Sequence, residues 1–184
     1  MVSKDEWSEL QSAIDADRRK ASEMLLHYEQ KLADYKAQKE DDLSRNKPHG
    51  GGHGSMPGAP TEAEAVASVS YDEKHDEYYW LKAVEIVQKA IDERKSMFLK
   101  CRREADRQLA KAKGHKPWVT LTQTLFTSAI EKRFFDNGNW ISERTVRTYW
   151  QSMCSRVVDI HLRLIKKNKI GCLFCGLFGG MMIS

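Results

Sequence analysis

Apolar residues recur every three or four positions over most of this chain, which is the spacing of one face of an α-helix. Residues 4–41 carry the longest such stripe, made of Trp7, Leu10, Ile14, Ala21, Met24, Leu25, Tyr28, Leu32 and Tyr35. The spacing predicts one amphipathic helix over this range. Asp17 and Lys31 would occupy seam positions of a strict heptad, which argues against a long coiled coil. A helix packed on its own domain and a self-association helix both stay open.

The stripe ends where Gly and Pro accumulate. The segment "KPHGGGHGSMPGAPTEAEA" runs from Lys47 to Ala65. Such a composition can neither continue a helix nor pack a core, so residues 47–60 are predicted to be a flexible linker. Thr61, with Glu64 three residues later, forms a capping box for the next helical region.

Helical periodicity returns after the linker. It predicts helices over 78–113, 121–135 and 142–167, with Gly114 as a helix stop and Asp136 to Asn139 as a turn. The sequence therefore predicts an all-α protein. Its parts would be an N-terminal interaction or oligomerisation helix (1–46), the linker (47–60), a helical domain (61–169) and an apolar, Gly-rich tail (170–184) of unassigned role.

The last two predicted helices and the turn between them suggest a helix-turn-helix at about 118–167. Ser142 would cap the second helix, because its hydroxyl can accept from an amide of the first turn. In such a unit the first turns of the second helix face base edges, where Arg reads guanine and Gln reads adenine. The candidate base-reading residues are Ser142, Glu143, Arg144, Arg147, Thr148 and Gln151. An ordinary helical hairpin with a polar outer face is the alternative.

Charge supports a polyanion partner for the C-terminal half. Residues 61–93 carry a net charge of −6 (3 basic, 9 acidic), whereas residues 94–116 carry +7 (9 basic, 2 acidic) and residues 140–169 carry +5 (7 basic, 2 acidic). Clustered Lys and Arg are typical of phosphate contacts. The candidate phosphate-contacting residues are Arg102, Arg103, Arg107, Arg156, Arg163, Lys166 and Lys167.

The sequence gives little support for a metal site or for catalysis, and we expect no cofactor. Cys172 and Cys175 form a single CxxC without a second pair, whereas a structural zinc needs four ligands. A P-loop, a Gly-x-Ser-x-Gly motif and an HExxH motif are absent. Asp72, Glu73, Asp76 and Glu77 cluster beside His75, and we interpret them as compensating the dipole at a helix start. We therefore do not expect an enzyme.

The segment "ISERTVRTYWQSMCSRVVDIHLRLI" resembles the end of RinA-type transcriptional regulators of phages of Gram-positive bacteria. The order of the preceding parts is similar too: an N-terminal helix, the "GGG" segment, "PTE", and a helix like "LKAVEIVQKAIDE". The resemblance covers roughly residues 20 to 167. It implies a sigma-region-4-like helix-turn-helix and activation of phage late genes with host RNA polymerase. The basic stretch 94–116 is longer than in that pattern, and the tail has no counterpart in it.

Three functions follow from these features. The leading hypothesis is a sequence-specific DNA-binding transcription activator in the cytoplasm of a bacterial host. The alternative is the small DNA-recognition subunit of a phage packaging terminase, although such subunits usually carry the DNA-binding unit near the N-terminus. The third is a protein-interaction module with an acidic partner. No apolar run reaches membrane-spanning length, and no signal-peptide core is present, so we expect no membrane partner.

Overall fold

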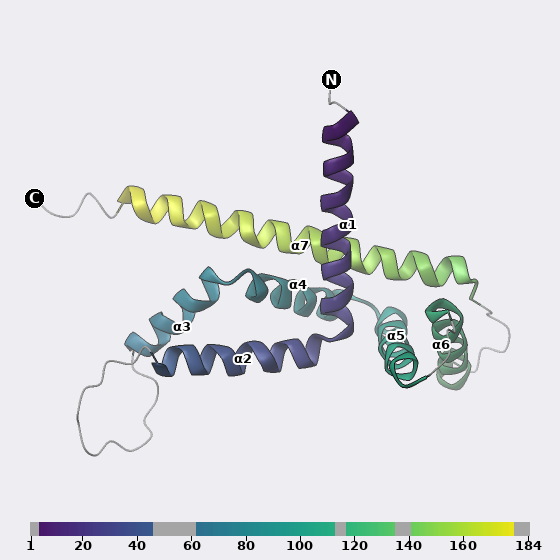
Figure 1. Cartoon of the computed structure of the whole chain (residues 1–184). Helices are drawn as coiled ribbons and strands as arrows, with labels where there is room; N and C mark the ends of the chain where they lie inside the picture. Colours follow the sequence, from purple (N-terminus) through teal and green to yellow (C-terminus); the bar gives the residue numbers. More distant parts are fainter. Residues whose placement is uncertain (1–3, 46–61, 113–116, 135–140, 179–184) are drawn as a thin grey trace, which may run out of the picture.

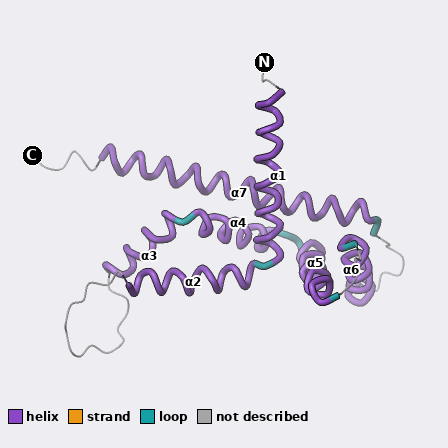
Figure 2. The backbone as a smooth tube through the Cα atoms, viewed as in Figure 1, coloured by secondary structure: helices purple, strands orange, loops and turns teal. Residues whose placement is uncertain are grey.

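The computed structural model describes residues 4–45, 62–112, 117–134 and 141–178, and side chains from residue 7 to residue 168 within these ranges except that of residue 134. The all-α prediction is confirmed there: the described ranges hold helices and no strand (Figure 2). The helices are α1 (Lys4–Leu26), α2 (Tyr28–Arg45), α3 (Glu62–Lys74), α4 (Asp76–Ala90), α5 (Glu93–Lys111), α6 (Trp118–Phe134) and α7 (Glu143–Phe178). The predicted linker, the Thr61 cap, the Gly114 stop and the turn at 136–139 lie outside the described residues.

The predicted N-terminal helix 4–41 is wrong as a single element, because the chain bends sharply at His27 (Figure 1). The Leu25 carbonyl accepts a hydrogen bond of 2.8 Å from Arg103 Nε of α5. A side chain 78 residues away thus engages a carbonyl that an unbroken helix would use for its own ladder. Helical periodicity continues through the bend, so the sequence pattern does not reveal it.

The predicted helix 78–113 is also wrong as a single element. Ile91 and Asp92 adopt extended backbone conformations, with φ/ψ of −84°/146° and −68°/167°. Asp92 then caps α5, since its side chain accepts from the amide of Lys95 at 2.8 Å. The break separates α4, which packs along α7, from α5, which pairs with α6.

Helices α5 and α6 form an antiparallel hairpin. Arg133, near the end of α6, pairs with Glu93 at the start of α5 at 2.9 Å. At the opposite end, the guanidinium of Arg102 lies 4.5 Å from the ring centroid of Trp118. The Phe98 and Phe126 rings meet edge to face between these points, with their centroids 5.3 Å apart. The hairpin supports the first turns of α7, where Tyr149 contacts both Phe rings.

One hydrophobic core holds these helices together, and α7 packs one face against α1, α4 and α6 to close it (Figure 1). Its fully enclosed members come from five helices: Ala21, Met24, Leu25, Ala83, Val84, Val87, Phe98, Ala105, Phe126, Val146 and Val157. The N-terminal helices α1 and α2 therefore share a core with the region predicted as a separate domain. Helix α7 extends to Phe178, beyond the predicted end at residue 167 and into the predicted tail.

Candidate nucleic-acid interface

The start of α7 is fixed as the sequence predicts. Ser142 Oγ accepts from the amide of Thr145 at 3.1 Å, and the Ser142 carbonyl accepts from the amide of Val146. Ser142 is thus confirmed as the N-cap. Below the cap, Val146 and Trp150 are buried. The first two turns of α7 are held by capping at one end and by burial of one face.

The opposite face of these turns is exposed and polar. We call Arg144, Arg147, Thr148 and Gln151 the polar stripe; all four are solvent-exposed. They lie at spacings of three, one and three residues, which places them on one side of a helix. The hydroxyl of Thr148 donates to the Arg144 carbonyl at 2.9 Å, so it has only acceptor capacity left for another donor.

Glu143 lies at the edge of the polar stripe. One of its carboxylate oxygens accepts from Thr120 Oγ1 of α6 at 3.0 Å, and the other lies 3.8 Å from Arg147. A carboxylate in the first helical turn is favourable beside the positive end of the helix dipole. The Glu143 side chain therefore stabilises the start of α7 and joins it to α6. Its predicted contact with a base is a separate question.

The predicted helix-turn-helix arrangement is not confirmed. In that motif a short turn places the end of the first helix beside the start of the second. Here residues 135–142 separate α6 from α7, and it is the first half of α6 that meets the start of α7. Gln123 Nε2 donates to the Ile141 carbonyl, and the Trp118 ring lies near the Trp150 ring, with centroids 6.4 Å apart.

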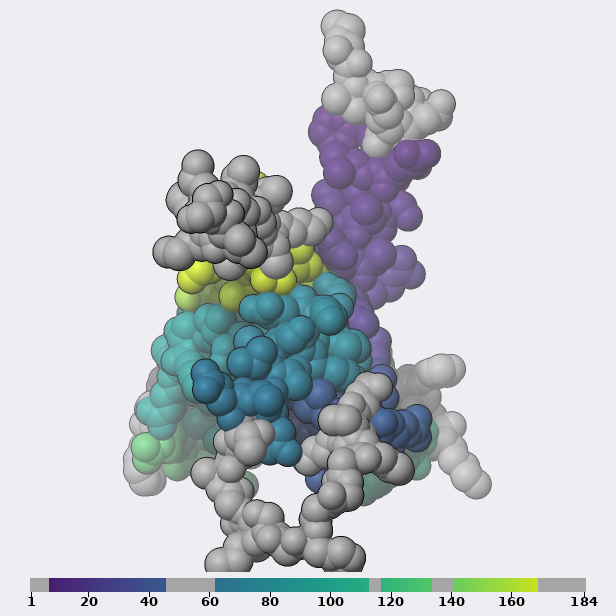
Figure 3. All heavy atoms as spheres, turned by 90° about the vertical axis from the view of Figure 1, so that its left-hand side faces the viewer, coloured from purple at the N-terminus to yellow at the C-terminus, as the bar shows by residue number. Residues whose placement is uncertain are grey.

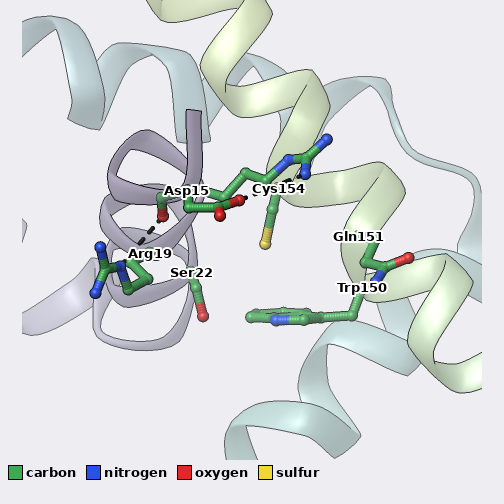
Figure 4. A pocket seen from close by; sticks show the side chains of 7 residues that line it. Asp15, Arg19, Ser22, Trp150, Gln151 and Cys154 are labelled. Carbon is green, nitrogen blue, oxygen red and sulfur yellow. Dashed lines mark hydrogen bonds and ion pairs between the residues drawn. The ribbon is translucent and has the colours of Figure 1, made fainter. Parts of the chain in front are cut away.

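Helix α1 crosses α7 beside the end of the polar stripe. An open pocket of about 510 Å³ lies at the crossing. Gln151, Trp150 and Cys154 line it from α7, and Asp15, Arg18, Arg19 and Ser22 line it from α1 (Figure 4). The polar stripe is therefore open over its first turns and is followed by basic side chains of α1 at Gln151.

Arg18 and Arg19 are site residues that the sequence interpretation missed. Both are exposed, and both contact Asp15: Arg18 Nη1 lies 3.8 Å from its carboxylate, and Arg19 Nε donates to its carbonyl. The signal was present as "DRRK" (residues 17–20), a basic run in an acidic N-terminal region. The sequence could not show that this run lies near the polar stripe, because only the tertiary structure brings α1 to α7.

Arg102 is not available as a phosphate contact in this structure. Its side chain is buried, and its guanidinium lies over the rings of Trp118 and Trp150 at 4.5 and 5.1 Å. Burial lowers its pKa, opposed by the charge of Asp106 at 3.5 Å. Cation–π contacts of this kind are strongest away from water. The prediction for Arg102 is corrected: this cation belongs to the core.

Arg103 is likewise engaged within the fold. Its Nε bonds to Leu25, and burial lowers its pKa. A guanidinium half enclosed at the junction of α1 and α5 has little surface to offer a phosphate. Arg107, one turn further along α5, is exposed and pairs with Glu104 at 2.9 Å. Of the three phosphate candidates on α5, only Arg107 is exposed to solvent.

The remaining phosphate candidates lie further along α7. Arg156, Arg163, Lys166 and Lys167 are exposed, and Arg163 pairs with Asp159 at 2.8 Å. Lys166 follows Arg147 by 19 residues of the same helix, or roughly 28 Å at the helical rise. A major groove is only about 12 Å wide. Lys166 and Arg147 therefore cannot lie in the same groove segment, and any phosphate contact by Lys166 would be remote from the polar stripe.

The acidic cluster around His75 is divided between two helices. Asp76 and Glu77 are in the first turn of α4, as the dipole interpretation requires. Asp72 and Glu73 instead end α3, where that interpretation is wrong. Asp72 Oδ1 accepts from Tyr35 at 2.7 Å and from Lys39 at 2.6 Å, which ties α3 to α2.

Asp76 also ties α4 to α7. Its two oxygens contact His161 Nε2 and Trp80 Nε1, each at 2.9 Å, and the two rings stack with centroids 3.7 Å apart. Within the described residues, no three His, Cys, Asp or Glu side chains converge as a metal site. The side chains of Cys172 and Cys175 lie outside them.

None of the helices in the described ranges is long and apolar enough to span a bilayer. Comparisons with known protein families, with curated proteins and with solved structures give no match to this chain. The case for function therefore depends on the arrangement of its own residues.

Proposed function

We propose that this chain is a non-enzymatic, sequence-specific DNA-binding activator of transcription, acting on phage late genes with host RNA polymerase as its resemblance implies. One observation carries the DNA-binding part: the exposed polar stripe of Arg144, Arg147, Thr148 and Gln151 on a capped helix end whose other face is buried. Arg and Gln are the side chains best suited to bidentate contacts with guanine and adenine. A rigid support keeps such contacts directional.

The surroundings of the polar stripe support the same proposal. Arg18 and Arg19 of α1 lie next to Gln151, where a duplex approached by the start of α7 would present its backbone. Arg107 and Arg156 add exposed positive charge on α5 and α7. The activator and polymerase parts rest on the resemblance alone.

The first test compares Arg147→Ala with Arg45→Ala. Arg147 belongs to the polar stripe, whereas Arg45 is an exposed arginine at the end of α2, paired with Asp41 at 2.7 Å. Duplexes selected by the natural protein from random DNA serve as the ligand. Arg147→Ala is expected to cost about 1–3 kcal/mol on the selected site and to relax one base position. Arg45→Ala should change neither.

Thermal unfolding of both variants accompanies the binding assay, and both should unfold like the natural protein because both side chains are exposed. Unchanged affinity and base preference for Arg147→Ala would exclude the polar stripe as the reading surface. Failure to select any sequence, despite a folded protein, would reject sequence-specific DNA binding.

The second test separates contacts with DNA phosphates from contacts with base edges. Replacing Arg156, Arg163 and Lys166 together by Gln should weaken all duplexes about equally and lower the log–log salt slope by about one for each phosphate that is no longer neutralised. A control away from α7 replaces two exposed cations, Arg45 of α2 and Lys89 of α4, which pairs with Glu85, and should leave the salt slope unchanged. A changed base preference with an unchanged salt slope would show that the three α7 cations do not bind phosphates.

A further inference from the structure

The first half of α1 presents apolar side chains to solvent. Trp7, Leu10 and Ile14 are 59%, 50% and 38% exposed. They continue the face of α1 that is fully buried further along, at Ala21 and Met24, with helical spacing throughout. The helix that anchors in the core thus carries the same apolar face into solvent. We call residues 7–14 the arm.

The arm stands clear of the body. Figure 1 shows α1 crossing α7 and continuing well beyond it, and Figure 3 shows this end of α1 projecting from the molecule. The arm therefore gains little from burial within its own chain, although its sequence is that of a packed helix. Exposed apolar stripes of this kind mark interaction surfaces.

A groove lies at the base of the arm, in the corner between α1 and the second half of α7. It has a volume of about 450 Å³. Ile14 lines it from the arm, and Val158 and Leu162 line it from α7. Leu162 is itself 53% exposed. Arm and groove form one continuous apolar surface, because Ile14 belongs to both.

We propose that this surface binds a second copy of the chain, with the two arms antiparallel about a two-fold axis near Leu10. In this register Trp7 of the second copy lies beside Ile14 and Leu162, and the reverse contact forms at the same time. A two-fold interface requires such a self-complementary patch. The antiparallel arrangement covers all four exposed apolar side chains, Trp7, Leu10, Ile14 and Leu162.

Charge favours the same occupant. The sequence from Lys4 to Glu9 carries three acidic residues and one basic residue. The groove is lined by Arg18 and Arg156, and in the antiparallel register the acidic segment just before Trp7 of one copy runs toward Arg18 of the other. Two carboxylates also line the groove, Asp17 and Asp159; Asp159 is already paired with Arg163, and Arg18 lies 3.8 Å from Asp15 of its own helix. An apolar centre with a charged rim is the usual composition of a protein interface.

Sedimentation equilibrium of the full chain tests this proposal. We expect a monomer–dimer equilibrium in the micromolar range. Leu10→Glu and Leu162→Glu should each raise the dissociation constant about tenfold or more, because each places a charge at the apolar centre. Val69→Glu is the matched control: Val69 is 57% exposed on α3, away from the arm, and its replacement should change nothing. Thermal unfolding of the dilute monomer should be unaltered in all three variants.

A photoreactive phenylalanine analogue at position 7 tests the register. In a mixture of isotopically light and heavy protein, cross-links should join position 7 of one copy to the peptide around Ile14 or Leu162 of the other. A monomer throughout the micromolar range would overturn the proposal. So would an assembly larger than a dimer, equal effects of Val69→Glu and Leu10→Glu, or cross-links confined to a single copy.

The dimer proposal does not rest on DNA binding, although Arg18 and Arg156 belong to both surfaces. The variants that test it lie outside the polar stripe, and the measurements are made without DNA. A dimer that selects no DNA would leave this proposal standing and reject the proposed function, whereas a monomer that selects DNA would do the reverse.

Discussion

Arg102 and Arg147 show how differently two arginines of basic helices are used. Arg147 is exposed on the polar stripe, while Arg102 is buried against two Trp rings. The long apolar stem and planar head of Arg allow both situations. Their replacement should therefore have opposite consequences for stability and for recognition.

We expect Arg102→Ala to lower the free energy of unfolding by about 2 kcal/mol or more, because it removes a desolvated cation–π contact and leaves space beside Trp118 and Trp150. Arg107→Ala, on the exposed side of the same helix, is the control and should stay within about 0.5 kcal/mol of the natural protein. Denaturant unfolding measures both. Equal stability of the two variants would show that Arg102 is not a core residue.

Among the helices, α5 and α7 begin with different caps. Asp92 caps α5 with a carboxylate, and Ser142 caps α7 with a hydroxyl. The Asp92 pKa lies below its usual value, first because of the hydrogen bond from the Lys95 side chain and then because of the Lys95 amide. A group whose pKa falls on folding stabilises the protein above its unfolded pKa, and this contribution is lost as the pH falls.

We expect Asp92→Ala and Ser142→Ala each to cost about 1 kcal/mol near neutral pH. The cost of Asp92→Ala should shrink as the pH falls below about 4, the range in which an unfolded Asp protonates. The cost of Ser142→Ala should not change there, because a hydroxyl does not titrate. Urea unfolding at several pH values provides the comparison. A pH-independent cost for Asp92→Ala would mean that its charge adds nothing to the cap.

For the whole molecule, the two halves of α1 have different roles. Met24 is fully enclosed in the common core, whereas Leu10 lies on the arm. The N-terminal helices cannot then be removed as an appendage without exposing the apolar surfaces of α4 and α7 on which they pack.

We expect Met24→Ala to lower the free energy of unfolding by about 2–5 kcal/mol, in a single transition that also disrupts α7. Leu10→Ala should leave the unfolding of the dilute monomer unchanged. Hydrogen exchange read along α1 and α7 distinguishes the alternatives. Independent unfolding of residues 4–45, with α7 still protected, would show that the N-terminal helices form a separate unit.

The sequence by itself determined the all-helical class, the inward faces of the helices that it predicted and the Ser142 cap, because these depend on residues three or four positions apart. It also identified the exposed side of the first turns of α7. It did not predict α3 as a separate helix. Only the tertiary structure decided where the two long predicted helices break. The first break accompanies the hydrogen bond from Arg103 to the Leu25 carbonyl, and the second lies at Ile91, where the backbone is extended. The tertiary structure also decided that Arg102 lies over the rings of Trp118 and Trp150, that Arg18 and Arg19 lie next to Gln151, and that Leu10 is left uncovered. Each of these depends on contacts between residues far apart in the chain, and the spacing of residues within one segment does not specify such contacts.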